Sequence, residues 1–201
     1  QRQMCIRDRV NNTETNHLLK IKVMPLTKKE LSRNLKKFKG VMWDQSPIFK
    51  KIYEEEYGQF GGEPFGCLVG DYYFDHSPQD IEILTEVAKI SSASHCPFIT
   101  GANPSLMQMD SWEELSNPRD ITKIFQNTEY AAAWRNLRSS DDARYLGLAL
   151  PRFMVRAPYG SASNPIDEFH FEEQVSDHEG YAWANAAYAM AVNINLSLIH
   201  I

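Results

Sequence analysis

The residues that could bind a metal ion fall into two small groups along the sequence. His76 lies close to Asp75 and Asp80, and His95 is followed directly by Cys96. Imidazole, carboxylate and thiolate groups are the usual protein ligands of zinc, so the residue types are suitable. Neither group has a recognised spacing such as His-x-x-x-His or Cys-x-x-Cys. We therefore assign no metal-ligating residue and place His95 at a helix end, where it interacts with exposed carbonyl groups.

Other residues could in principle supply a nucleophile or a phosphate site. Cys67 could act as a thiol nucleophile, but it lies in an apolar run typical of a buried strand, where cysteine is usually inert. The glycine-rich residues 58–66 lack both the Lys-Ser/Thr ending of a phosphate loop and the spacing of a dinucleotide fingerprint. The three carboxylates at 54–56 point around a helix and predict a solvated face. We assign no catalytic and no cofactor-binding residue, and we predict that the chain is not an enzyme.

Composition narrows the class of protein further. The 201 residues are 43% hydrophobic and 23% charged, which is typical of one globular domain with a real core. The formal net charge of −5 argues against nucleic acid as a partner. No apolar run is long enough to cross a bilayer, so no membrane insertion is expected. Cys67 and Cys96 favour a reducing compartment over a disulfide framework.

The two ends of the chain are predicted not to be native protein. Residues Met4 to Arg9 and Leu196 to Ile201 can be encoded by DNA stretches that are reverse complements, apart from one free base. Both stretches also match the transposon end used as a sequencing adapter. We predict that residues 1–9 and 196–201 are translated adapter sequence, and we exclude them from reasoning about the fold.

The N-terminal part of the remaining chain predicts a strand and two helices. Residues 18–23 mix apolar side chains with alternating lysines, which favours a strand with one solvated face. Its free edge could pair with a neighbouring chain. A capping box at Thr27 begins a helix that ends near Gly40. A second helix begins at Pro47 and ends at Gly58.

The middle of the chain predicts a parallel crossover. Residues 65–74 form an apolar strand pattern, and Pro78 opens an amphipathic helix that ends near His95. Residues 98–100 form a second short strand. Strand, helix and strand in this order indicate an α/β (α+β) fold, which we expect to be a mixed sheet with flanking helices.

The C-terminal part is less regular. Residues 103–138 predict short helices broken at Asn117-Pro118, and residues 145–155 predict an irregular edge strand interrupted by Pro151. Residues 158–168 form a polar loop. Residues 181–195 predict a final helix, and alanine and aromatic residues cover most of its circumference. We therefore expect this helix to be buried on nearly every side.

Several stretches of the sequence together resemble one known family. The longest is FKKIYEEEYGQFGGEPFG at residues 49–66. Shorter stretches follow it in order at 68–72, 78–80, 96–99, 118–120, 125–130, 134–135, 144–152, 169–173 and 183–189. In order and spacing they resemble the large subunit of the contractile sheath of type VI secretion systems. The resemblance covers nearly all of residues 10–195, which are identified as part of a sheath large-subunit domain, incomplete at both ends.

The resemblance implies a structural role and a set of partners. The large sheath subunit pairs with a small sheath subunit in the bacterial cytoplasm, and the heterodimers stack as a helical polymer around an inner tube protein. The sheath is built on a baseplate and contracts to propel the tube and spike. The family has no catalytic residues, metals or cofactors to carry over to this sequence.

Two alternatives stay open at this point. The first is a contractile tail sheath of a phage or phage-like particle, which differs in system and not in mechanism. The second is an α/β hydrolase or ligand-binding domain, since the strand-helix-strand section occurs in many such proteins. A deep pocket that gathers His76, His95 and Cys67 would support the second alternative.

Overall fold

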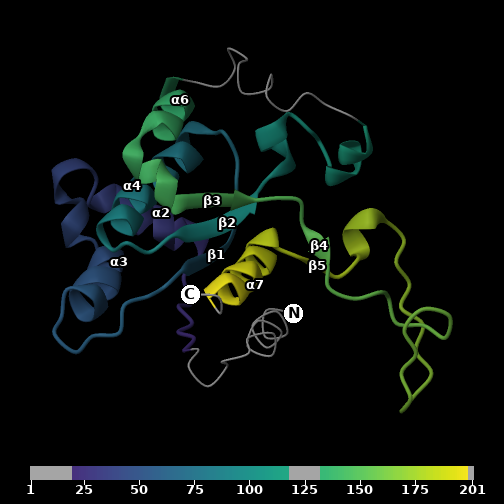
Figure 1. Ribbon diagram of the computed structural model, residues 1–201. Coiled ribbons are helices and arrows are strands. Elements are labelled where there is room, and N and C mark those ends of the chain that lie inside the picture. The colour runs from purple at the N-terminus through teal and green to yellow at the C-terminus, as the bar shows by residue number, and fades with distance from the viewer. Residues whose placement is uncertain (1–19, 118–131, 199–201) are drawn as a thin grey trace.

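Helices surround a three-stranded parallel sheet in the computed structural model, which describes residues 20–117 and 132–198 (Figure 1). The sheet order is β1-β2-β3, so β2 is central. Its strands are β1 (Leu68–Phe74), β2 (Phe98–Ala102) and β3 (Leu146–Ala149). A separate antiparallel pair is formed by β4 (Phe153–Met154) and β5 (Trp183–Ala184). The predicted α/β class is confirmed, with both parallel and antiparallel pairing present.

The first described helix, α2 (Lys28–Lys37), begins as its capping box predicts. The hydroxyl of Thr27 accepts a hydrogen bond from the backbone N–H of Glu30 at 3.2 Å. The Glu30 carboxylate in turn accepts from the backbone N–H of Thr27 at 2.9 Å. These two bonds satisfy N–H groups that a helix start leaves without partners. The helix buries Leu31 and Leu35 in the core.

Replacing Thr27 with alanine should lower the free energy of unfolding by about 1 kcal/mol, because the first turn of α2 loses its cap. Thr27→Ser keeps the hydroxyl and should lose only a few tenths of that amount. Chemical denaturation of the three proteins measures the difference. Equal stability of the alanine and serine variants would show that the cap contributes nothing here.

The strand predicted over residues 18–23 is not formed in its described part, residues 20–23. Residues 20–25 make no backbone–backbone hydrogen bond to any described residue. Instead, the Lys22 ammonium forms an ion pair with Glu56 and lies 5.3 Å from the centre of the Phe65 ring. The prediction was wrong because strand propensity does not create a strand where no neighbouring strand lies alongside. Residues 18 and 19 lie outside the described residues.

The second predicted helix is present but has an unexpected form. A 3-10 turn, η2 (Gly40–Gln45), leads into α3 (Pro47–Phe49), and the helix continues with the wider π-type turns of η3 (Lys50–Tyr57). The rings of Phe49 and Tyr53 stack along it at 4.8 Å between centroids. Helix propensity does not distinguish α from π turns, so the sequence predicted the helix and not its pitch.

The predicted parallel crossover is confirmed. Helix α4 (Pro78–Ala93) connects β1 to β2, and Leu68 pairs with Phe98 where the two strands begin. The pairing shifts between Gly70 and Tyr73, which leaves a bulge in β1. Helix α4 buries most of its circumference against the sheet and α2, as a helix does when it is covered on two sides.

Short helices connect β2 to β3, as predicted. They are η4 (Pro104–Met107), η5 (Trp112–Ser116), α6 (Ala132–Ser139) and η6 (Asp141–Tyr145). The predicted break at Asn117-Pro118 falls at the edge of the described residues, which end at Asn117. Pro118 and the family stretch at 125–130 lie outside them. The predicted irregular strand at 145–155 divides at Pro151 into β3 and β4, which belong to different sheets.

The last helix, α7 (Ala186–Leu198), differs from its prediction in two ways. It does not begin at residue 181, because Trp183 belongs to β5 and the Asn185 side chain accepts from the N–H of Ala187 at the helix start. It is also not buried on nearly every side, since Ala189, Met190 and Asn193 are exposed. The apolar residues of α7 predicted burial all round, but the described residues cover only one side of the helix. The adapter origin of residues 1–9 and 196–201 stays a prediction, and residues 1–9 and 199–201 lie outside the described part.

The two faces of the sheet are covered by different helices. Phe98 and Ala102 of β2 pack in the main core, to which α4 contributes Leu84 and Ile90. The opposite face carries Gly101, whose α-carbon lies against the side chain of Asn185 at the start of α7. Figure 1 shows α7 in front of the sheet. Among residues 20–117 and 132–198, no helix is long and apolar enough to cross a membrane.

Candidate functional site

The residues that could do chemistry do not converge. His76 precedes α4 and His95 follows it, and the 16 residues of this helix separate its ends by about 24 Å. Cys67 directly precedes β1, at the same end of the sheet as His95 and away from His76. No group of three metal-binding side chains occurs within the described ranges. His76, His95 and Cys67 therefore do not line one common pocket, which the hydrolase or ligand-binding alternative required.

His95 and Cys96 have structural surroundings. His95 follows the helix with a φ of 49°, and its Nδ1 lies 3.0 Å from the hydroxyl of Tyr145. Cys96 is buried, and burial raises the pKa of its thiol to about 12. A thiol with so high a pKa carries almost no thiolate at neutral pH, which disfavours both nucleophilic and metal-binding roles.

A hollow in the described surface lies away from these residues. An apolar groove of about 350 Å³ runs between β3, the residues after it, and α7. Its lining includes Ile99, Ala149, Pro151, Phe153, Ala186 and Met190. Apolar side chains dominate the lining, and no histidine or cysteine belongs to it. Such a surface suits packing against further protein better than a reaction.

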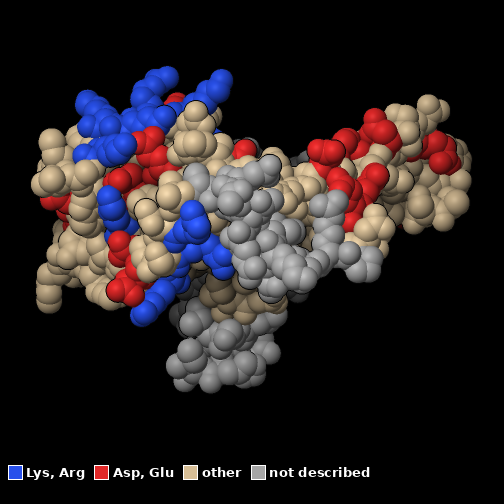
Figure 2. All heavy atoms as spheres, turned by 90° about the horizontal axis from the view of Figure 1, so that it is seen from above, with Lys and Arg blue, Asp and Glu red and all other residues tan. Residues whose placement is uncertain are grey.

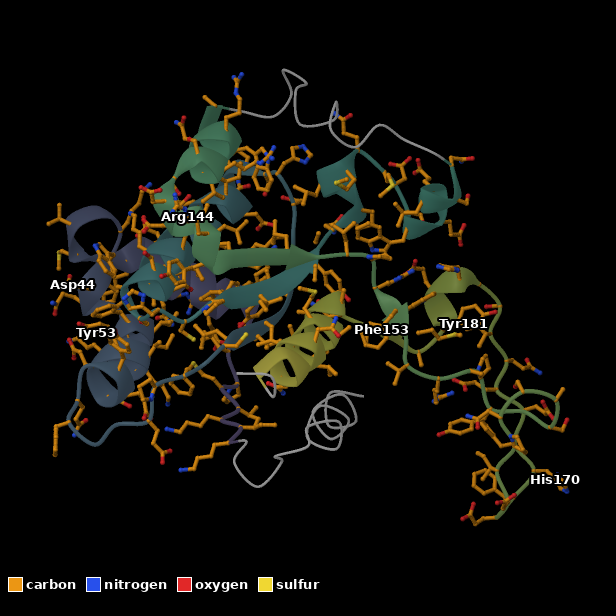
Figure 3. The ribbon with its side chains drawn as sticks, in the orientation of Figure 1. Asp44, Tyr53, Arg144, Phe153, His170 and Tyr181 are labelled. Carbon is orange, nitrogen blue, oxygen red and sulfur yellow. The ribbon has the colours of Figure 1, made fainter. Side chains whose placement is uncertain are left out.

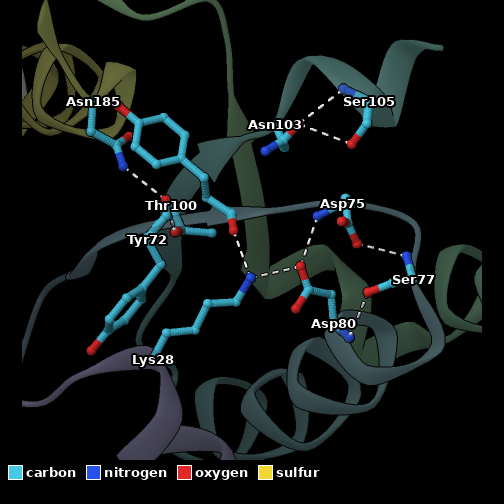
Figure 4. Close-up of polar contacts among 10 residues, drawn as sticks. Lys28, Tyr72, Asp75, Ser77, Asp80, Thr100, Asn103, Ser105 and Asn185 are labelled. Carbon is cyan, nitrogen blue, oxygen red and sulfur yellow. Dashed lines mark hydrogen bonds and ion pairs between the residues drawn. The ribbon is translucent and has the colours of Figure 1, made fainter. Parts of the chain in front are cut away.

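A buried polar contact fixes α7 on the sheet (Figure 4). The Asn185 side-chain amide donates to the carbonyl of Tyr72 at 2.8 Å, and the Thr100 hydroxyl donates to the same carbonyl at 3.0 Å. Tyr72 lies in the bulge of β1, so its carbonyl is available to side chains. Because Asn185 and Thr100 are both buried, the contact holds α7 in one position.

A second polar contact ties α2 to the turn between β1 and α4 (Figure 4). The Lys28 ammonium lies 2.7 Å from the Asp80 carboxylate and 2.7 Å from the carbonyl of Tyr73. Asp80 also accepts from the backbone N–H of Asp75 at 2.9 Å. Sequence reasoning placed Asp80 at the helix start for its charge alone and missed Lys28, because their 52-residue separation leaves no local signal.

Residues 156–177 form an arm that projects from the rest of the molecule (Figures 1 and 3). Its base is closed by a two-bond ion pair in which Arg156 donates to Glu173 at 2.5 and 3.2 Å. The Arg156 guanidinium also lies 4.0 Å from the centre of the Tyr159 ring. Farther out, Ser161 donates twice to Glu172. These contacts hold the arm in one shape although it has no helix or strand of its own.

Replacing Glu173 with glutamine should loosen the arm. The Arg156 hydrogen bonds lower the pKa of the Glu173 carboxyl, so the native residue is charged at neutral pH, and the variant loses that charge. We expect limited proteolysis within the arm to become about tenfold faster, since cleavage follows local opening. Glu168→Gln, at an exposed arm residue without an ion pair in the described structure, is the matched control and should be cleaved like the wild type. Equal cleavage of both variants would contradict the assigned role of the ion pair.

Comparison with known proteins decides the family. A family model described as VipB, the EvpB/VC_A0108 tail sheath N-terminal domain, matches residues 4–200. The chain belongs to this tail sheath family. The resemblance seen in the sequence is thereby confirmed.

A curated relative agrees with the tail sheath assignment. The chain is similar to the type VI secretion system sheath protein TssC1 of Pseudomonas aeruginosa, with 65% identity over 190 residues. The aligned part is 94% of this tail sheath chain and 38% of the relative, so the chain spans well under half of the relative's length.

The longest family stretch, residues 49–66, begins in the core of the tail sheath chain with Phe49 and Ile52 and ends in a turn on its surface. It forms the end of α3, all of η3 and the glycine-rich turn, and Phe60 in that turn is fully exposed. A large apolar side chain on an exposed turn suits a contact with another protein.

Proposed function

We propose that this chain is part of the large subunit of a type VI secretion contractile sheath and serves as a structural building block. The observation that carries the proposal is the tail sheath match over residues 4–200, together with the 65% identity to a protein named as a type VI secretion sheath protein. The relative's name favours the secretion system over a phage tail.

The proposed partners are a small sheath subunit, further copies of the large subunit, an inner tube protein and a baseplate, assembled in the bacterial cytoplasm. Three features suit repeated protein contacts: the apolar groove beside α7, the exposed turn at Phe60, and the projecting arm. The backbone of residues 20–25 pairs with no described residue, so a strand of a neighbouring chain can pair with it.

Contraction needs no chemistry in the sheath itself. Two packings of one lattice that differ by a few kcal/mol per subunit are enough, because the difference is summed over many copies. Open contacts between unlike surfaces generate helical polymers of this kind. A rigid subunit with fixed polar contacts, such as that of Asn185, would pass force between neighbours without deforming.

Electron microscopy of the full-length protein, co-expressed with its small subunit, tests the proposal. We expect hollow helical tubes that are absent when either partner is omitted. A soluble monomer that binds no small subunit and forms no polymer would overturn the proposal.

A further inference from the structure

The end of the arm carries two exposed aromatic rings. The side chains of Phe169 and Phe171 are 58% and 44% exposed, and their ring centroids lie 6.1 Å apart. The ion pair of Arg156 with Glu173 holds the arm behind them. Large apolar groups on a projecting and well-fixed segment are typical of a protein contact, because the segment loses little conformational freedom on binding.

The charge around these rings is negative. Residues 156–177 contain five acidic residues and one arginine. Asp167 and Glu168, directly before the phenylalanines, are exposed and form no ion pair with any described residue. Figure 2 shows acidic side chains gathered over this end of the molecule. A matching surface should therefore be apolar at its centre and basic around it.

Such a surface lies at the opposite end of the same chain. We call residues 28–45, which include α2 and η2, the basic shoulder; they contain six basic and two acidic residues. Lys28, Lys36 and Lys39 pair with acidic residues of α4. The other three, Lys29, Arg33 and Lys37, are exposed and form no ion pair with a described residue. Val41 and Met42 are 95% and 56% exposed beside the lysines. Figure 3 shows Asp44 of the shoulder and His170 of the arm at opposite ends of the molecule.

We propose that the arm of one copy docks on the basic shoulder of a second copy, with Phe169 and Phe171 against Val41 and Met42. The arm cannot reach the shoulder of its own chain, since the two lie at opposite ends. When the arm of one copy binds the shoulder of another, the pair still has one free shoulder and one free arm. Further copies can therefore add at both ends and build an open polymer. The inference rests on the proposed function and names one contact within that polymer.

Substitutions that reverse the charge of each surface test the contact in the full-length protein, co-expressed with its small subunit. The arm variant is Asp167→Lys with Glu168→Lys, and the shoulder variant is Arg33→Glu with Lys37→Glu, both at exposed positions. Arg33 and Lys37 lie one turn apart on α2, so both changes fall on one side of the shoulder. Asp110→Lys with Asp141→Lys makes the same change of charge as the arm variant, at two exposed positions outside the arm, the shoulder and residues 49–66, and is the control.

We expect each variant alone to reduce sedimentable tubes about tenfold, because like charges then face each other. One protein carrying both sets of changes should recover tubes to within about twofold of the wild type, and the control with Asp110→Lys and Asp141→Lys should assemble normally. Copurification of the small subunit, unchanged in every variant, shows that the subunits are folded.

Other results overturn the contact. Full assembly of either single variant, or loss without recovery in the combined variant, would rule out this pairing of surfaces. Loss of small-subunit copurification would assign the arm or shoulder to that partner instead. Absence of tubes in the wild type would overturn the proposed function itself, and the contact with it.

Discussion

Replacement of Asn185 by leucine is expected to lower the free energy of unfolding by about 2–4 kcal/mol. The buried amide donates to the carbonyl of Tyr72 and accepts from the N–H of Ala187, and leucine can do neither. The N–H of Ala187 then loses its capping acceptor at the start of α7. The Asn185 side chain also packs tightly on Gly101: a β-carbon added to that glycine would lie 2.6 Å from the amide oxygen of Asn185. The branched end of leucine therefore has little room at position 185. Thermal and denaturant unfolding of the purified chain measure the loss.

The matched control is Asn193→Leu, on the same helix but exposed. It should change the free energy of unfolding by less than about 0.5 kcal/mol, because no buried hydrogen bond is lost. A similar loss for both variants would mean that the effect comes from α7 in general and not from the contact with Tyr72. Combining Asn185→Leu with Thr100→Val should give a non-additive loss, since both side chains serve the same carbonyl.

Truncation of Leu84 to alanine is expected to cost about 2–5 kcal/mol, the range found for leucines deep in protein cores. Leu84 is fully buried in the middle of α4, and its neighbours in the core belong to several elements. The cavity cannot close by moving one side chain, because α4 is held between the sheet and α2. Denaturant midpoints of the two proteins give the difference.

Leu115→Ala makes the same chemical change at a residue that is 39% exposed, and it should cost less than about 1 kcal/mol. A cost for Leu84→Ala no larger than that of Leu115→Ala would show that α4 is not packed as described. In the full-length protein, the Leu84 variant should also yield fewer tubes, because fewer subunits are folded.

Local signals in the sequence were sufficient for most helices and strands. The side chains of Thr27 and Ser77 cap helices by accepting hydrogen bonds from backbone N–H groups three positions ahead. Residue types at this spacing are enough to predict such caps. The crossover of β1, α4 and β2 follows from the order of apolar patterns, and its parallel pairing is nearly forced by the connecting helix.

What the sequence could not reveal depends on residues far apart in the chain. The contact of Asn185 with Tyr72 spans 113 positions, so no local pattern indicates it. Residues 20–23 have strand propensity, but a strand also needs a partner alongside, which only the folded molecule provides or withholds. The shape of the arm likewise carried no signal, since it comes from the ion pair of Arg156 with Glu173 and from hydrogen bonds within an irregular loop. Its amino-acid composition predicted only a polar loop.

The position of β2 has a consequence for how the molecule opens. All five of its residues are buried, and strands flank it on both sides. Its amide hydrogens can therefore exchange with solvent only when the sheet itself separates, whereas those of the edge strand β3 can exchange through local fraying. The exchange rate at Ile99 thus reports the free energy of global unfolding, and the difference from β3 measures how cooperatively the chain unfolds.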